Sequence, residues 1–178
     1  SGSGAVAAFG RLLLDSEIHF FAGPSWGSGA MPLVPVIREM PDKIMISPSV
    51  GVASFNEAAQ NIFNLWPHDE ASSKVLATFA ITHSLMKGAL LLAETPWDLQ
   101  MGDAFEMEYK RLGGIITARM EPSQSAGDFR AEILRIRATK PDFVFITNFN
   151  VIPEAAKELK KSGFKGQIYS PLTSPAVM

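Results

Sequence analysis

The sequence predicts an α/β protein built on doubly wound parallel sheets, arranged in two lobes of which the first is incomplete. Short apolar runs alternate with longer amphipathic stretches, and this strand–helix alternation is most regular from Leu85 onward. An apolar fraction of 47% and a charged fraction of 19% are typical of a packed globular chain. Turn residues follow the apolar runs, as they do where a strand leads into a helix.

The second lobe starts with a helix at 71–84 and a buried strand at 89–93. Thr95 then predicts a helix N-terminus, because a proline occupies the first helical position and Asp98 follows three residues later. Gly113 and Gly114 end that helix. Asp128 is expected to cap the next helix. The remaining elements are strands at 115–120, 143–147 and 167–170 and a helix at 153–162.

The first lobe follows the same alternation with fewer elements. We expect helices at 5–14 and 30–40 and strands at 18–22 and 43–47, with no strand before the first helix. Residues 48–67 look irregular, and so long a stretch is usually functional or a crossover. The predicted organisation is a linker or cloning remnant at 1–4, a partial N-terminal lobe at 5–63, a hinge crossover at 64–70 and a second lobe at 71–172.

Composition excludes several classes of function. Sixteen basic and 18 acidic residues give a net charge of −2 without a basic stripe, so nucleic acid is not an expected partner. No apolar run approaches the roughly 20 residues that span a bilayer. The chain has no cysteine, and His19, His68 and His83 lack metal-ligand spacing. We therefore expect no metal and no cofactor. No secretion signal is recognisable, so composition does not give the location.

Four loops follow predicted strands and are the candidate binding loops. Residues 23–29 and 48–51 bring serine hydroxyls and glycines, which suit an anionic group. Residues 94–97 and 148–150 bring aromatic rings. Ligands of open parallel sheets bind at the carboxyl ends of the strands, so these loops predict a small ligand with one anionic end and an apolar body. Tight turns and lobe packing also use these residue types, which leaves a purely structural interpretation open.

A remote alternative is a serine hydrolase. Residues 23–27 match the G-x-S-x-G pattern, with Ser25 as the nucleophile between a strand and a helix. A hydrolase of this kind needs its catalytic histidine after the acid. His83 is the last histidine of the chain, so no core strand after it could carry the histidine that acts as the base. No pair of carboxylates suits acid–base catalysis. The sequence therefore favours a binding protein over an enzyme.

Several stretches, taken in order, resemble the type I periplasmic binding proteins, in particular the leucine/isoleucine/valine-binding branch of ABC-transporter substrate-binding proteins. The order and spacing of these stretches agree from residue 5 to about residue 171. They are Ile-His-Phe-Phe-Ala-Gly-Pro at 18–24, Ile-Ser-Pro-Ser at 46–49, residues 63–67, Leu-Gly-Gly at 112–114, Gly-Asp-Phe at 127–129, Lys-Pro-Asp-Phe-Val-Phe at 140–145, and Lys-Ser-Gly at 161–163 before Gln-Ile at 167–168.

The resemblance implies roles for individual residues. The loops around Gly27 and Ser49 would hold the carboxylate of the ligand, and aromatic residues of the second lobe would close over it. Where the family has an acid for the ammonium of an amino acid, this sequence has Leu172, which favours an aliphatic or aromatic carboxylate, because an unpaired buried ammonium is costly. The candidate site residues are Ser25, Trp26, Gly27, Ser28, Ser49, Gly51, Trp97, Phe149 and Leu172.

The resemblance also implies a setting. The partners would be a small carboxylate-bearing or amino-acid-like ligand and the membrane permease of an ABC transporter, in the periplasm or outside the cell. A sensory ligand-binding domain on the same fold is the alternative, since fold alone does not separate the two. An incomplete lobe with an open sheet edge also predicts possible self-association.

Overall fold

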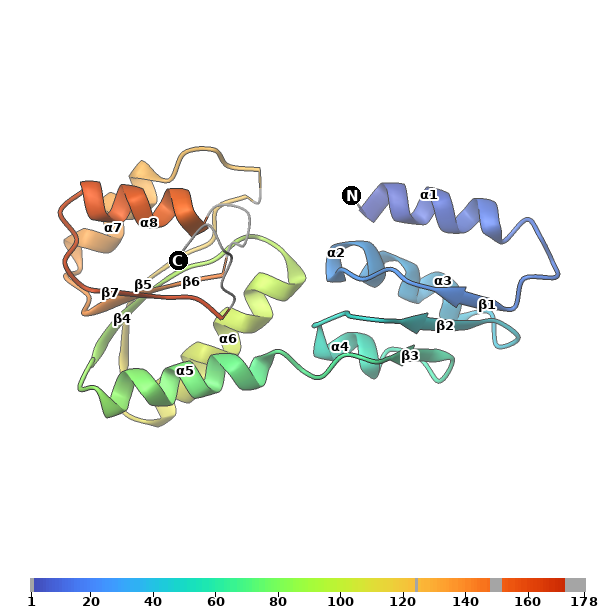
Figure 1. The fold of residues 1–178 in the computed structure, drawn as a ribbon, viewed down its shortest axis with the longest axis horizontal. Coiled ribbons are helices and arrows are strands. Elements are labelled where there is room, and N and C mark those ends of the chain that lie inside the picture. The colour runs from blue at the N-terminus through green and yellow to red at the C-terminus, as the bar shows by residue number, and fades with distance from the viewer. Residues whose placement is uncertain (1, 124, 148–151, 172–178) are drawn as a thin grey trace. The chain divides into compact units, whose positions relative to one another are not determined.

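The computed structural model describes residues 2–123, 125–147 and 152–171, and the chain forms two compact units (Figure 1). Unit 1 comprises Ser1–Asp69 and unit 2 comprises Glu70–Met178. The division after Asp69 falls inside the segment predicted as a hinge, 64–70. Hinge motion in that segment stays a prediction.

Unit 1 contains a parallel three-stranded sheet in the order β1-β2-β3, which confirms the predicted parallel α/β pattern. The side chains alternate between its two faces. Phe21 of β1 and Met45 of β2 are buried, and Phe9 packs edge-on against Phe21 with ring centroids 4.8 Å apart. On the opposite face Phe20 and Phe63 are exposed. The elements are α1 (Gly2–Leu12), β1 (Phe20–Ala22), α2 (Gly27–Ala30), the 3-10 helix η1 (Met31–Leu33), α3 (Val34–Arg38), β2 (Ile44–Ser47), α4 (Ala53–Asn56) and β3 (Ile62–Asn64).

Two predictions for unit 1 are wrong in detail. The helix expected at 30–40 is divided among α2, η1 and α3, because Pro32 and Pro35 lack a backbone N–H and each lies in the first turn of a new helical piece. Residues 48–67 are not irregular throughout, since they contain α4 and β3. In the sequence, Asn61 interrupts the hydrophobic periodicity. In the structure, its side-chain amide donates to the carbonyls of Ile37, Met40 and Lys43 and holds the start of β3 in place.

Unit 2 contains a four-stranded parallel sheet in the order β5-β4-β6-β7, so the predicted doubly wound architecture is confirmed. Helices α5 and α6 cover one face, and α7 and α8 cover the other (Figure 1). The elements are α5 (Glu70–Thr82), β4 (Lys87–Leu91), α6 (Pro96–Arg111), β5 (Ile115–Met120), α7 (Arg130–Ala138), β6 (Phe143–Ile146), α8 (Ile152–Lys161) and β7 (Gln167–Tyr169). None of the described helices has the length and apolar character needed to cross a bilayer.

The two helix N-termini predicted from capping residues have different outcomes. Thr95 has extended backbone angles and its Oγ1 accepts the N–H of Asp98 at 3.2 Å, so the predicted cap of α6 is confirmed. Asp128 is not the N-cap of α7, because Phe129 holds that position. The Asp128 carboxylate instead accepts the backbone N–H of Arg130 at 3.0 Å. Its bonds to Arg130 lower the pKa of Asp128 to about 2.

Two buried clusters stabilise unit 2, one on each face of the sheet. On the α5–α6 face, Phe105 lies among the rings of Tyr109, Phe143 and Phe145. On the α7–α8 face, aliphatic side chains of both helices meet the other side of β4 and β6. Every residue of β6 is buried, as the sequence predicted for its most apolar strand. Strands covered on both faces form a rigid platform, and the loops at their carboxyl ends are positioned by it.

Candidate ligand-binding loops

In unit 1, hydrogen bonds join the loop after β1 to the loop after β2. The hydroxyl of Ser47 donates to the carbonyl of Pro24 at 2.8 Å, and the hydroxyl of Ser49 donates to the carbonyl of Ser25 at 3.4 Å. The N–H of Gly23 also donates to the carbonyl of Ile46 at 2.9 Å. The structure therefore brings together Ser25 and Ser49, two predicted site residues that are 24 positions apart in the sequence.

The start of α2 lies in the first of these loops and carries three more predicted site residues. Trp26 is the N-cap, with extended backbone angles, and the residue is 68% exposed. Ser28 is exposed, whereas Gly27 is buried. A Cβ on Gly27 would lie 2.5 Å from Cγ2 of Val52, so the close contact between the two loops requires glycine. Gly27 and Ser28 are the first two residues of α2, and the first N–H groups of a helix have no acceptor within it.

Asn64 holds the loop after β2 and was not predicted as a contributor to the site. Its Oδ1 accepts the N–H of Val50 at 3.2 Å, and its Nδ2 donates to the carbonyl of Val50 at 2.6 Å. Gly51, a predicted site residue, is buried beside this pair of bonds. The sequence showed Asn64 only as an interruption of the hydrophobic period. One signal could have identified its role: an asparagine at the end of a strand can hydrogen-bond the backbone of a neighbouring loop.

In unit 2, Trp97 lies in the first turn of α6 and is half-buried. It follows Thr95, whose cap fixes where the helix begins, so the cap also fixes the backbone that carries the indole ring. Phe149 and Leu172, the other two predicted site residues of this unit, lie outside the described residues. Their roles stay predictions from the sequence.

A buried polar cluster that sequence analysis missed lies beside Trp97. The hydroxyl of Thr95 donates to Oδ2 of Asp98 at 2.5 Å, and Asp98 and Thr147 are 6% and 1% exposed. Burial raises the pKa of the Asp98 carboxyl group above its ordinary value, while the hydroxyls of Thr95 and Thr147 act in the opposite direction. Within the described residues no charged side chain contributes to this shift. The sequence showed Asp98 only as a helix-capping acid.

Replacing Asp98 with asparagine is expected to remove a pH dependence of stability. Because the folded pKa of Asp98 lies above its unfolded value, the carboxylic acid contributes stability that is fully present below the unfolded pKa, near 3.8. That stability is lost as the pH rises through the folded pKa. Unfolding free energies measured from about pH 4 to about pH 8 should show the unsubstituted chain losing stability relative to Asp98→Asn. A stability difference between the two chains that stays constant across this pH range would contradict the raised pKa of Asp98. So would a loss of stability of the unsubstituted chain, relative to Asp98→Asn, as the pH falls.

The described histidines give no support to hydrolase or metal chemistry. His19 bonds the carbonyl of Asp42, His68 bonds Asn56, and His83 bonds the carbonyl of Phe79. Among the described residues no group of three or more histidine or acidic side chains could hold a metal ion.

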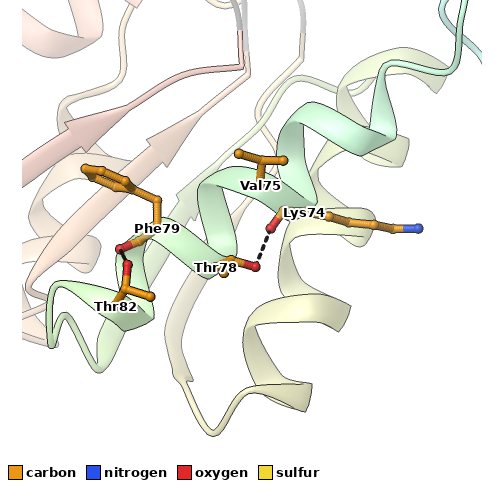
Figure 2. Close-up of a pocket in the computed structure, with 5 residues that line it drawn as sticks. All are labelled: Lys74, Val75, Thr78, Phe79 and Thr82. Carbon is orange, nitrogen blue, oxygen red and sulfur yellow. Dashed lines mark hydrogen bonds between the residues drawn. The ribbon is translucent and has the colours of Figure 1, made fainter.

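A shallow hollow of 380 Å³ lies on the surface of α5 (Figure 2). Figure 2 shows its lining side chains along a single helix, with the hydroxyls of Thr78 and Thr82 donating to carbonyls of the same helix. None of its lining residues belongs to a loop that follows a strand, and it contributes nothing to the candidate site. The lining residues are Lys74, Val75, Thr78, Phe79 and Thr82.

Each unit has a parallel sheet with its candidate loops at the carboxyl ends of the strands, an arrangement typical of ligand-binding α/β proteins. The chain belongs to the periplasmic binding protein family, whose model matches residues 1–178. This confirms the family resemblance that the sequence indicated. A comparison with curated proteins gave no match.

Solved structures of binding proteins share this fold. The leucine-binding protein LivK of Thermotoga maritima has a TM-score of 0.87 at 17% identity, over 96% of this chain and 49% of that chain. A solute-binding protein of an ABC transporter from Rhodopseudomonas palustris, in complex with 4-hydroxybenzoate, has a TM-score of 0.82 at 16% identity, over 100% and 49%. Another from the same species, in complex with 3,4-dihydroxybenzoic acid, has a TM-score of 0.79 at 17% identity, over 96% and 47%. The chain thus spans about half the length of these solved proteins.

Proposed function

We propose that this protein is a solute-binding component of an ABC transporter that captures a small, carboxylate-bearing, apolar ligand between its two lobes. The observation that carries the proposal is the pair of hydrogen-bonded loops in unit 1. The Ser49 hydroxyl donates to the carbonyl of Ser25, which holds the two loops together beside the first turn of α2, where Ser28 is exposed. Such a surface suits a carboxylate, which accepts hydrogen bonds from several donors at once.

The second unit would supply the apolar contact. Trp97 lies in the first turn of α6, whose start is fixed by the Thr95 cap. A rigid aromatic ring binds a flat apolar ligand at low entropic cost. Phe149 would add a second ring. The ligand would be enclosed when the two lobes close about residues 64–70, a hinge movement common in binding proteins.

An aromatic or aliphatic acid is a better candidate ligand than a free amino acid. Leu172 offers no charge to an ammonium group. Asp98 is a poor substitute, because its carboxyl group is buried and already accepts the hydroxyl of Thr95. Solved proteins of this fold have benzoate and 4-hydroxybenzoate as ligands, and one is a leucine-binding protein. We therefore propose aromatic carboxylates as the first ligands to test. Delivery to a membrane permease, in the periplasm or outside the cell, completes the proposed role.

A thermal-shift comparison of acids and amino acids tests this function. Benzoate and 4-hydroxybenzoate should raise the unfolding temperature, because a ligand at 100 times its dissociation constant adds about 2.7 kcal/mol to the folded state. Leucine at the same concentration should give no shift, and benzamide, which has the ring without the charge, serves as the matched control. Stabilisation by leucine alone would contradict the argument from Leu172.

A further inference from the structure

Half of the basic residues of the chain lie in one segment of unit 2. Residues 128–166 contain eight of the 16 basic residues and five of the 18 acidic ones, a net charge of +3 in a chain whose net charge is −2. The sequence shows no basic stripe, because β6 separates the basic residues of α7 from those of α8. The fold places both helices on the same face of the sheet (Figure 1), so it gathers charges that the sequence keeps apart.

The two helices adjoin along this face. A Cβ on Gly163, in the loop after α8, would lie 3.6 Å from Nη2 of Arg137 on α7. Bonds to Asp128 raise the pKa of Arg130 on α7, and the charge of Glu158 on α8 acts in the same direction. The exposed outer sides of α7 and α8, with the loops that follow them, therefore form one continuous surface. We call it the α7–α8 surface, and all of it belongs to unit 2.

Six cations of this surface are exposed and make no ion pair with a described residue. Three of the five acids of the segment are already occupied, two by ion pairs and one by backbone N–H groups. Glu132 and Glu154 are the remaining two, so the unpaired charge of the surface is strongly positive. The six cations are Arg135, Arg137, Lys140, Lys157, Lys160 and Lys165.

Helix dipoles explain part of this pattern. Cations stabilise the last turn of a helix, where Arg135, Arg137 and Lys160 lie. Lys157 lies in the middle of α8, and Lys165 lies four residues beyond its end, so the dipole does not account for either. An exposed surface with more like charge than its helices require is typical of one that binds a polyanion.

The residues between the cations favour a lipid surface over a nucleic acid. Leu134 is 61% exposed, and its spacing of four and three residues places it on the same face of α7 as Arg130 and Arg137. A membrane interface takes up such an apolar side chain while the cations contact the headgroups. Single-stranded nucleic acids are bound by stacking on exposed aromatic rings, whereas the described aromatic residues of 128–166 are buried or half-buried.

We propose that the α7–α8 surface binds an anionic lipid membrane. The attraction is a sum of individually weak contacts that salt screens, so the binding is reversible. Helices that connect parallel strands run in the opposite direction to the strands, so the C-terminal ends of α7 and α8 lie at the amino ends of the strands. Trp97 lies at the other end of the sheet, beyond the carboxyl end of β4. A ligand at Trp97 and a membrane at this surface therefore use different residues.

Flotation of the 178-residue chain with lipid vesicles tests the proposal. In about 50 mM salt the chain should float with vesicles of phosphatidylglycerol and phosphatidylcholine, and about 500 mM salt should release it. Vesicles of phosphatidylcholine alone should not bind it. Combining Arg137→Gln with Lys157→Gln should weaken binding about 30-fold. Both side chains are exposed and unpaired, so the fold should be retained, and circular dichroism checks this.

The matched control combines Arg11→Gln with Lys74→Gln. These substitutions remove the same two residue types, and the same charge, from exposed positions on α1 and α5. Binding should change by less than about twofold, because neither cation lies on the α7–α8 surface.

A fluorescent label locates the contact without a change of charge. The chain has no cysteine, so Leu134→Cys and Val75→Cys each give a unique attachment site. A nitrobenzoxadiazole label at Leu134→Cys should brighten and shift to the blue with the anionic vesicles. The same label at Val75→Cys should not respond, because Val75 is exposed on α5, which covers the other face of the sheet.

Four results would overturn the proposal. The first is an absence of flotation with anionic vesicles. The second is an equal loss of binding in the two double variants, because net charge alone would then govern binding. The third is a response of the label at Val75→Cys and none at Leu134→Cys. The fourth is binding to polyglutamate or RNA without binding to vesicles, which would assign the surface to a different polyanion. None of these results bears on the ligand tests of the proposed function.

Discussion

Replacing Phe105 with alanine is expected to destabilise unit 2 by about 3–5 kcal/mol. The Phe105 side chain is fully buried, and its ring lies 4.3 Å from that of Phe145, 5.5 Å from that of Tyr109 and 5.7 Å from that of Phe143, centroid to centroid. Truncation removes the ring from all three contacts at once and leaves a cavity between α6 and the sheet. The loss therefore combines the transfer free energy of the ring with the cost of the cavity.

Urea denaturation of the two chains, followed by far-ultraviolet circular dichroism, measures this difference. Met107→Ala is the matched control, because Met107 lies on the same helix and is 65% exposed, so its truncation should change stability by less than about 0.5 kcal/mol. A loss below about 1 kcal/mol for Phe105→Ala would show that the aromatic cluster is not the core of unit 2.

Replacing Trp97 with alanine is expected to weaken binding of an aromatic acid about 30-fold, which corresponds to about 2 kcal/mol. The indole lies in the first turn of α6, directly after the loop that follows β4, and the Thr95 cap fixes the backbone that carries it. The fold should be retained, because Trp97 is half-buried at a helix start and lies outside both buried clusters.

Calorimetric titration with 4-hydroxybenzoate gives the affinities. Trp66→Ala is the matched control, since Trp66 is a partly exposed tryptophan whose indole N–H donates to Asp69 at 2.8 Å, and it is not a candidate site residue. Equal affinities for the unsubstituted chain and Trp97→Ala would remove Trp97 from the site.

The fold of unit 2 could be predicted from the sequence because its signals are strong and local. The Thr95 capping pattern marks the start of α6, and Gly113, with its positive φ, marks the end of the same helix. The continuous apolar run at 143–146 predicts a buried strand. Each of these signals acts within a few residues. Local signals are the ones that a single sequence shows directly.

The fold of unit 1 was harder because its determinants are distant in sequence. The three-residue strand β3 is too short to show a period, and Asn61, which fixes its start, bonds carbonyls that are 18 to 24 residues away. Proline at positions 32 and 35 divides a stretch that otherwise has helical spacing. Tertiary hydrogen bonds of this kind override local propensity.

The candidate site could be predicted only in part, for a related reason. Glycine and serine after an apolar run predict a binding loop. A hydrogen bond joins Ser25 and Ser49 in the structure, and their role in binding stays a prediction. Asp98 and Thr147 gave no signal, because the first looked like a capping acid and the second like the end of a strand. Their relation depends on burial and on strand order, which the local pattern does not show.

The central claim is that one carboxylate-bearing ligand contacts the strand-end loops of both units. Two-dimensional ¹H–¹⁵N NMR with added 4-hydroxybenzoate tests it most directly. We expect concerted shifts of the backbone amides of Gly27 and Ser28 in unit 1 and of the indole N–H of Trp97 in unit 2, all saturating at one ligand concentration. Shifts confined to one unit, or confined to the hollow on α5 around Val75 and Phe79, would contradict the claim.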